Sequence, residues 1–235
     1  MGISRRAVLL GGAGLVGAAG TYGALTPRGR RLLGWTGPDG VVPSVEPVPV
    51  QPMPWGAWTG AAGPVVLVLH GRGRGGSVAW WEELGLPRFL HGCGFRCAVV
   101  NGGEDYWVDF DPPVPFEAAL GVSMGGFGVL DIASRRPLKA VAAISPALFP
   151  SWEDAQRIGG FASREVWEAH EPLRHKAGIT SPVGVWCGRE DPFHDPAREL
   201  ADGVGAVGSF EHGEHDVGYW RRVLPDALKF IGQRL

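Results

Sequence analysis

The sequence predicts an α/β fold in which a mostly parallel sheet is covered by helices on both faces. From residue 64 onward, short apolar runs alternate with longer stretches of helical periodicity, which is typical of that architecture. The apolar runs are continuous rather than interrupted by polar residues, as expected for strands buried on both faces. A chain of 235 residues with 45% hydrophobic content is long enough for one well-packed domain.

The apolar runs place the strands, and the patterns between them place the helices. We expect strands at 64–70, 97–101, 118–122, 139–145 and 183–188, with a weaker one at 206–211. We expect helices at 77–92, 125–136, 195–203 and 216–235. In the last of these, apolar residues recur at three- and four-residue spacing: Trp220, Val223, Leu224, Leu228 and Ile231.

Residues 1–36 have the composition of an export signal. They carry five arginines and no acidic residue, and the stretch from Ala7 to Pro27 is uncharged and rich in Gly and Ala. Arg5 and Arg6 before an apolar run resemble the twin-arginine signal, which directs a folded protein out of the cytoplasm. We therefore expect an exported, extracytoplasmic protein. Residues 7–27 are either part of a removed leader or a membrane tether; a transmembrane helix is the alternative.

Residues 37–63 are predicted to be a proline-rich linker before a folded domain at 64–235. The stretch "VPSVEPVPVQPMP" holds five prolines in thirteen residues, which favours an extended chain. Beyond residue 36 the chain has 17 basic against 24 acidic residues, which argues against a nucleic-acid partner. The three cysteines, Cys93, Cys97 and Cys187, are an odd number, so at least one stays free; a Cys93–Cys97 bridge and small buried thiols are both open.

Ser123 is the candidate nucleophile. It is the central residue of "GVSMG" (121–125), which matches G-x-S-x-G, the pattern of a sharp strand-to-helix turn that presents a reactive serine. A predicted strand precedes it and a predicted helix follows it, as the motif demands. Gly121 and Gly125 would allow a strained backbone and a close approach of the helix to the strand. The alternative is a small residue in a tight turn.

A glycine-rich loop, "HGRGRGG" at 70–76, follows the first predicted strand. Its backbone amides are free to face a developing negative charge, so we expect the amides of Arg72 and Met124 to form an oxyanion hole. A phosphate-binding loop or a plain turn is the alternative. The loop has no Lys-Ser/Thr after its last glycine, which a Walker sequence requires.

The acid and the base are expected after the two last strands. Asp191 in "GREDPFHD" is placed to hold a histidine tautomer, with Glu190 and Asp195 as rivals. His215 directly precedes the final helix and is preferred over His212 as the base. The two histidines could instead bind a metal ion, although the glycine between them disfavours a helical ligand pair. Ser123, Asp191 and His215 occur in the order nucleophile, acid, base.

The segments "VVLVLHGRGRGG", "GVSMGGFGVL", "GREDPF" and "HDVGYWRRVLPDALKFI" resemble the esterase D and antigen 85-type branch of the α/β-hydrolases. The resemblance spans most of 64–235. The tethered form with a twin-arginine signal resembles exported actinobacterial esterases. It implies an α/β-hydrolase fold, Ser123 as nucleophile, Asp191 as acid, His215 as base and the Arg72 and Met124 amides as oxyanion donors. It implies no cofactor and no metal.

Two departures from that family are visible in the sequence. Only residues 104–117 are left for the connection that usually holds a helix before the nucleophile strand. The strands that usually precede the first parallel strand are shortened to "PMPWGAWTGAAG" or absent. The fold is therefore expected to be trimmed at the first strands and at this crossover.

The expected function is an exported serine hydrolase that cleaves carboxylic esters through an acyl-enzyme on Ser123. An acyltransferase of the same mechanism, or a cell-surface binding protein that has lost catalysis, is the alternative. The substrate would be a small-molecule, lipid or sugar ester. Four tryptophans could line an acyl pocket or belong to the core: Trp80, Trp81, Trp107 and Trp152.

Overall fold

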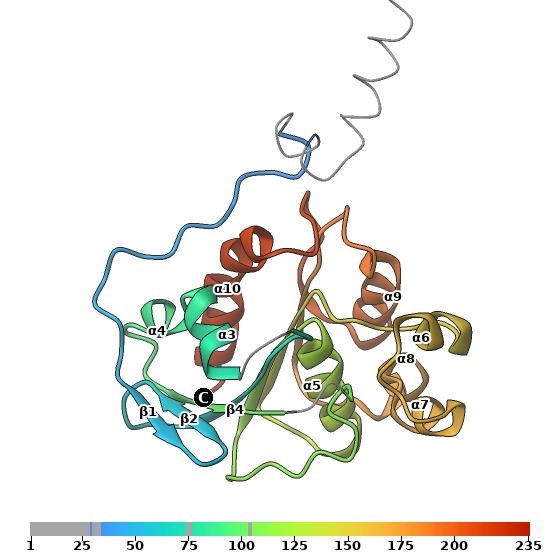
Figure 1. Cartoon of the computed structure of the whole chain (residues 1–235), viewed down its shortest axis with the longest axis horizontal. Helices are drawn as coiled ribbons and strands as arrows, with labels where there is room; N and C mark the ends of the chain where they lie inside the picture. Colours follow the sequence, from blue (N-terminus) through green and yellow to red (C-terminus); the bar gives the residue numbers. More distant parts are fainter. Residues whose placement is uncertain (1–28, 30–33, 74–76, 103–104) are drawn as a thin grey trace, which may run out of the picture.

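The computed structural model describes residues 29, 34–73, 77–102 and 105–235. An eight-stranded sheet runs through the molecule with helices on both sides (Figure 1). The predicted mostly parallel sheet is confirmed. The expected export signal at 1–36 lies almost entirely outside the described residues.

The strand order of the sheet is β1-β2-β4-β3-β5-β6-β7-β8. The pairs β1–β2 and β2–β4 are antiparallel, and every later pair is parallel. The carboxyl ends of the parallel strands therefore meet at one edge, where ligands of open α/β sheets bind. The strands are β1 (Val50–Met53), β2 (Gly56–Thr59), β3 (Val65–Leu69), β4 (Arg96–Val100), β5 (Ala118–Val122), β6 (Ala140–Ile144), β7 (Val183–Trp186) and β8 (Val207–Ser209).

The helices form two layers, one on each face of the sheet. One layer holds α3 (Ser77–Leu84), α4 (Leu86–Phe89) and α10 (Val217–Gly232). The other holds α5 (Met124–Arg135), α6 (Trp152–Ile158), α7 (Arg164–His170), α8 (Pro172–His175), the short 3-10 turn Lys176–Gly178 and α9 (His194–Val204) (Figure 1).

Side chains of the central strands alternate between the two layers. Leu67 and Leu69 of β3 pack with the α5 layer, while Val66 and Val68 pack with the α10 layer. All four are fully buried. Successive side chains of a strand point to opposite faces of the sheet. Because both faces are buried here, every position is apolar, and the strands appear in the sequence as uninterrupted apolar runs.

The linker prediction for 37–63 is wrong over residues 50–59. These residues form β1 and β2, an antiparallel pair that joins the sheet through β4. Each strand has four residues, so the first strands are shortened rather than absent. Pro52 is tolerated because β1 is the edge strand, where an amide donor is not required on the outer side.

The helix expected at 77–92 is interrupted at Gly85. The residue has φ 94° and separates α3 from α4, and a Cβ there would lie 2.8 Å from the Val42 side chain. Glycine is needed because the left-handed backbone and the packed valine both exclude a side chain. The segment that contains α6, α7 and α8 was given no helix by the sequence patterns. The remaining predicted helices, α5, α9 and α10, are confirmed with shifts of a few residues at their ends.

The crossover from β4 to β5 has turns but no helix in its described residues, as its length predicted. Tyr106 and Trp107 are buried, at 2% exposure each, and belong to the core on the α5 side. The Tyr106 ring stacks on Phe161 with centroids 4.6 Å apart. Two aromatic side chains thus fill space that a crossover helix would otherwise cover.

Among the described residues, no helix combines the length and the apolar character that crossing a membrane requires.

Candidate active site

Ser123 lies in the sharp turn between β5 and α5. The strand ends at Val122 and the helix begins at Met124. Ser123 has φ 56° and ψ −117°, a conformation that costs a non-glycine residue about 1–3 kcal/mol. Its amide donates to the Ile144 carbonyl of β6 at 2.9 Å, and the residue is only 8% exposed. The surrounding strands therefore hold this strained turn at the carboxyl edge of the sheet.

The two glycines of the G-x-S-x-G pattern are required by close backbone contacts. A Cβ on Gly121 would lie 2.0 Å from the carbonyl oxygen of Gly125. A Cβ on Gly125 would lie 2.1 Å from the carbonyl oxygen of Leu69, at the end of β3. Because both obstacles are backbone atoms, a side chain at either position would force the first turn of α5 away from the sheet.

The structure brings Ser123, His215 and Asp191 together. His215 Nε2 is 2.9 Å from Ser123 Oγ, and His215 Nδ1 is 2.8 Å from Asp191 Oδ2. Asp191 follows β7, and His215 lies in the loop between β8 and α10. With the Nδ1 proton donated to Asp191, Nε2 is left as an acceptor for the serine hydroxyl. This arrangement lets the imidazole take up the proton of Ser123.

Aromatic rings hold the imidazole of His215 in place. The Phe193 ring lies at a centroid distance of 5.3 Å and the Trp220 ring at 5.2 Å, both edge-on. Trp220 is in α10, and Phe193 directly precedes α9. Both positions were missed by the sequence analysis as parts of the site, because nothing in a pattern indicates which aromatic residue meets which histidine.

Asp191 is kept ionised by its partners. Burial alone would raise the pKa of its carboxyl, but the hydrogen bond and the charge of His215 and the Phe193 amide outweigh burial and lower it. The Phe193 amide donates to Asp191 Oδ1 at 2.9 Å. A carboxylate with both oxygens occupied holds the histidine in one orientation and stabilises its protonated form.

The predicted oxyanion donors, the amides of Arg72 and Met124, belong to the two segments that adjoin Ser123. Gly71, beside Arg72, packs against Ser123 so closely that a Cβ there would be 3.2 Å from the Ser123 Cβ. Met124 is the first residue of α5, so its amide has no acceptor within the helix. The Arg72 side chain reaches across to the Ile158 carbonyl at the end of α6, 2.8 Å from Nη1. The glycine-rich loop is described up to residue 73.

No family model and no curated protein matches this sequence. Solved structures do match. An S-formylglutathione hydrolase from Agrobacterium tumefaciens aligns with a TM-score of 0.57 at 19% identity, over 74% of this chain and 84% of that one. Fluorophosphonate-binding serine hydrolase F from Staphylococcus aureus gives 0.56 at 14% identity, over 73% and 85%. A bacterial heroin esterase gives 0.55 at 16% identity, over 76% and 78%.

The chain has the α/β-hydrolase fold. The strand order and the turn at Ser123 agree with this assignment, and the fold class expected from the sequence resemblance is confirmed. At this level of identity the similarity establishes the fold, and the chemistry has to be argued from the residues of this chain.

In this α/β-hydrolase fold, neither of the two rival acids, Glu190 and Asp195, contacts His215 in the described part of the chain. Glu190 contacts the other histidine: its Oε1 is 2.7 Å from His212 Nδ1, and its Oε2 accepts from the Gly213 amide at 2.7 Å. Partial burial alone would raise the pKa of the Glu190 carboxyl. The hydrogen bonds from His212 and Gly213 outweigh burial, so the pKa is lowered. Asp195 has a 97% exposed side chain and contacts His194. Of the three acids, Asp191 alone contacts His215 in the described part of the chain.

The structure describes the histidines of the metal alternative, His212 and His215, and the three cysteines of the disulfide alternative. His212 and His215 contact different carboxylates, and the described residues contain no cluster of three or more His, Cys, Asp or Glu side chains that could hold a metal ion. All three cysteines are free thiols. Burial raises the pKa values of Cys97 and Cys187 well above the ordinary thiol range.

The four tryptophans divide between core and site. Trp81 and Trp107 are buried at 1% and 2% exposure, so both belong to the core. Trp152 packs near Trp167 in the α6–α7 region, with centroids 6.2 Å apart. Trp80 lies near the glycine-rich loop: a Cβ on Gly71 would be 3.4 Å from its ring. Trp80 therefore lies beside Gly71, the residue that packs against Ser123.

Proposed function

We propose that this protein is a serine hydrolase that cleaves carboxylic esters through an acyl-enzyme on Ser123. The observation that supports this most directly is the continuous contact from Ser123 Oγ to His215 Nε2, 2.9 Å, and from His215 Nδ1 to Asp191, 2.8 Å, at a strained strand-to-helix turn. A hydroxyl, a base and a carboxylate in that order form the general arrangement that activates a serine.

The first half of the reaction forms the acyl-enzyme. His215 Nε2 accepts the Ser123 proton while Oγ attacks the ester carbonyl carbon, and the carbonyl oxygen becomes an oxyanion. The amides of Arg72 and Met124 donate hydrogen bonds to that oxyanion, each worth about 3–4 kcal/mol in comparable enzymes. When the tetrahedral intermediate collapses, His215 gives its proton to the leaving alcohol.

The second half releases the acid. Water enters, His215 accepts its proton, and the hydroxyl attacks the acyl carbon; collapse returns the proton to Ser123 and frees the carboxylic acid. Asp191 stays ionised throughout and stabilises the protonated imidazole, consistent with the lowered pKa of its carboxyl. These steps use protein groups and water alone.

The names of the structural neighbours support hydrolysis at an acyl carbonyl. They include an S-formylglutathione hydrolase and a heroin esterase, and also a monoacylglycerol lipase and a puromycin-hydrolyzing peptidase. This range favours a shared acyl-enzyme mechanism with different leaving groups. For this chain we propose an ester of a small molecule, a lipid or a sugar as the substrate.

The proposal is tested by labelling and turnover. A fluorophosphonate probe should label folded wild-type protein at Ser123, and short p-nitrophenyl esters should be hydrolysed. Ser123→Ala should abolish both, and Ser44→Ala, at an exposed serine of the N-terminal segment, should change neither. Folded wild-type protein that neither reacts with the probe nor turns over esters would favour a binding protein instead. Product analysis with an added sugar acceptor separates hydrolysis from acyl transfer.

We further propose that the protein is exported by the twin-arginine route and acts outside the cytoplasm, either secreted or tethered through residues 7–27. Arg5, Arg6 and the uncharged stretch after them support this proposal. Cell fractionation tests it: replacing both arginines with lysine should retain the protein in the cytoplasm. Unchanged export of that double variant would contradict the route.

A further inference from the structure

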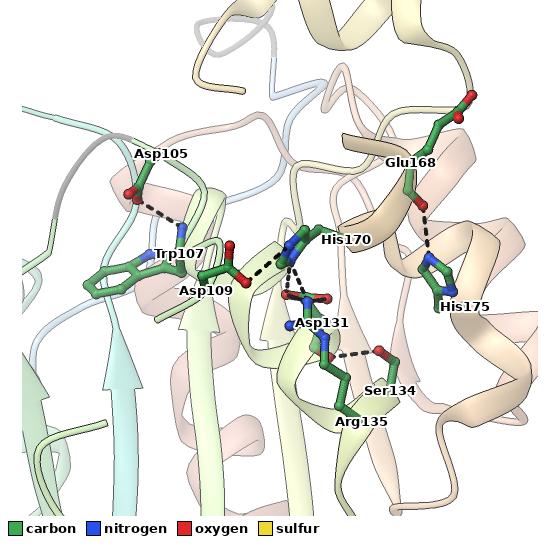
Figure 2. Close-up of polar contacts among 9 residues, drawn as sticks. All are labelled: Asp105, Trp107, Asp109, Asp131, Ser134, Arg135, Glu168, His170 and His175. Atoms are coloured by element: carbon green, nitrogen blue, oxygen red, sulfur yellow. Dashed lines mark hydrogen bonds and ion pairs between the residues drawn. The ribbon is translucent and has the colours of Figure 1, made fainter. Parts of the chain in front are cut away.

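A contact between a carboxylate and a histidine ring lies on the outer side of the crossover. Asp109 lies in the crossover, and its Oδ1 is 3.5 Å from Nε2 of His170, the last residue of α7 (Figure 2). The Asp109 side chain is 82% exposed, whereas that of His170 is only 7% exposed. An exposed loop residue thus meets a buried ring that belongs to the helical layer.

The ring of His170 is oriented independently of Asp109. Its Nδ1 is 3.0 Å from Asp131 Oδ2 on α5, and the Arg135 guanidinium contacts the same nitrogen and the Asp131 carboxylate (Figure 2). Asp131 is buried, and Arg135 is one turn further along the same helix. Because α5 holds the Nδ1 side of the ring, Nε2 faces the crossover and the Asp109 carboxylate.

The crossover needs such an anchor because its backbone is strained. Tyr106, Trp107 and Asp109 have φ values of 60°, 61° and 52°, in the left-handed region that non-glycine residues rarely adopt. Such a backbone conformation is unfavourable for a residue with a side chain, so contacts of the segment have to stabilise it. The described inner contacts are the burial of Tyr106 and Trp107, and the contact on the exposed side is Asp109 with His170.

Trp107 connects this segment to the glycine-rich loop. Its Nε1 donates to the His70 carbonyl at 3.3 Å, and the two rings meet edge-on with centroids 5.0 Å apart. The His70 carbonyl belongs to the peptide group next to the one that carries the Arg72 amide. The position of the Trp107 indole therefore bears on the position of that amide relative to Ser123.

We propose that Asp109 and His170 are positioning residues for the reaction: their contact anchors the crossover so that Trp107 holds the His70 carbonyl and, through it, the Arg72 amide at the serine. This inference rests on the proposed ester hydrolysis. Neither residue touches the reacting atoms. We expect them to affect the position of the Arg72 amide. That donor stabilises the transition state and contributes little to substrate binding.

The test uses an exposed aspartate as matched control. Asp109→Ala should lower kcat for a p-nitrophenyl ester about tenfold with KM changed less than about twofold, because a displaced donor is lost mainly from the transition state. Asp111→Ala removes a charge from an exposed position two residues away and should leave both constants unchanged. Both variants should stay folded and unfold in a single cooperative transition in urea.

A double-mutant cycle identifies the partner. In an His170→Asn background, Asp109→Ala should have no further effect on kcat, since the pair acts as a unit. Hydrogen exchange supplies a readout besides activity: Asp109→Ala should speed amide exchange at 105–110 and at 71–73, and leave β6 unchanged.

Equal kcat values for Asp109→Ala and Asp111→Ala, additive effects in the cycle, or unchanged exchange at 71–73 would each overturn the inference. Wild-type protein without Ser123-dependent turnover would instead refute the proposed function, and the exchange experiment would still decide on the anchor.

Discussion

Trp107 of the crossover lies directly against Gly128 of α5, where a Cβ on the glycine would come within 2.8 Å of the Trp107 Cβ. Gly102 also contacts Trp107, because a Cβ on it would lie 2.1 Å from the six-membered part of the indole. Two residues without side chains therefore make room for the Trp107 side chain. This packing lets a connection without a helix in its described residues cover the side of α5.

Gly128→Ala should destabilise the protein. The added methyl group has to displace Trp107 or α5, which costs about 1–3 kcal/mol and exceeds the gain of about 1 kcal/mol in helix propensity. We expect a lower free energy of unfolding in urea, with an unchanged slope. Gly232→Ala, at the end of α10, is the control: its Cβ would meet Phe95 at an ordinary 3.5 Å, so stability should stay equal or rise. Equal stability of Gly128→Ala and wild type would show that the contact is not tight.

The fold was predictable where its determinants are local. Strands buried on both faces require continuous apolar runs, and those runs gave β3 to β7 directly. Strands β1 and β2 were not predictable, because strands of four residues are too short to show a periodicity and acquire their pairing from the edge of the sheet. The length of the crossover predicted that it would hold no helix, but its path was not predictable, because left-handed residues such as Tyr106 and Trp107 are set by packing across the molecule.

The candidate site was predictable to the level of loops. Strand ends indicated where the hydroxyl, the acid and the histidine should lie, and these expectations brought Ser123, Asp191 and His215 into consideration. The sequence favoured Asp191 as the acid but left Glu190 as a rival, since adjacent residues point in different directions and only the backbone decides. The structure directs Asp191 to His215 and Glu190 to His212.

Asp191→Asn should remove most of the activity while preserving the fold. An asparagine cannot hold the histidine tautomer or stabilise the imidazolium, and the loss in kcat in comparable enzymes is about 10⁴-fold. The pKa of Asp191 is lowered in the folded state, so its contribution to stability is present above its ordinary pKa of 3.8 and is lost as the pH falls through the folded value. The stability difference between wild type and variant should therefore shrink in acid. Asp195→Asn, at an exposed position, should change neither activity nor this pH dependence.

Glu171 should make the protein less stable as the pH rises. It is fully buried, and burial raises the pKa of its carboxyl to about 8 although the amides of Phe149 and Leu173 and the Trp167 indole donate to it. The folded state then keeps a proton that the unfolded state releases near pH 4.5, so the free energy of unfolding falls between about pH 4.5 and 8.

Glu171→Gln isolates that contribution, because glutamine does not titrate. Denaturant unfolding of both proteins at several pH values should give a difference, wild type minus variant, that decreases from pH 4.5 to pH 8. The variant is expected to be less stable at acid pH. The side-chain NH2 group of glutamine is a donor, and it would face the Leu173 amide, which donates to Oε1 of Glu171. Parallel stability curves across this window would show that Glu171 does not change its protonation there.

His215→Ala and His212→Ala should differ sharply in activity. The two histidines are three residues apart and each contacts its own carboxylate, but only His215 has its second ring nitrogen within 2.9 Å of Ser123 Oγ. We expect kcat/KM for a p-nitrophenyl ester to fall by about a thousandfold or more in His215→Ala, since the serine loses its general base. His212 is 58% exposed and pairs with Glu190, so its removal should cost less than about threefold. Comparable losses in both variants would mean that the loop, rather than the His215 ring, supplies what the reaction needs.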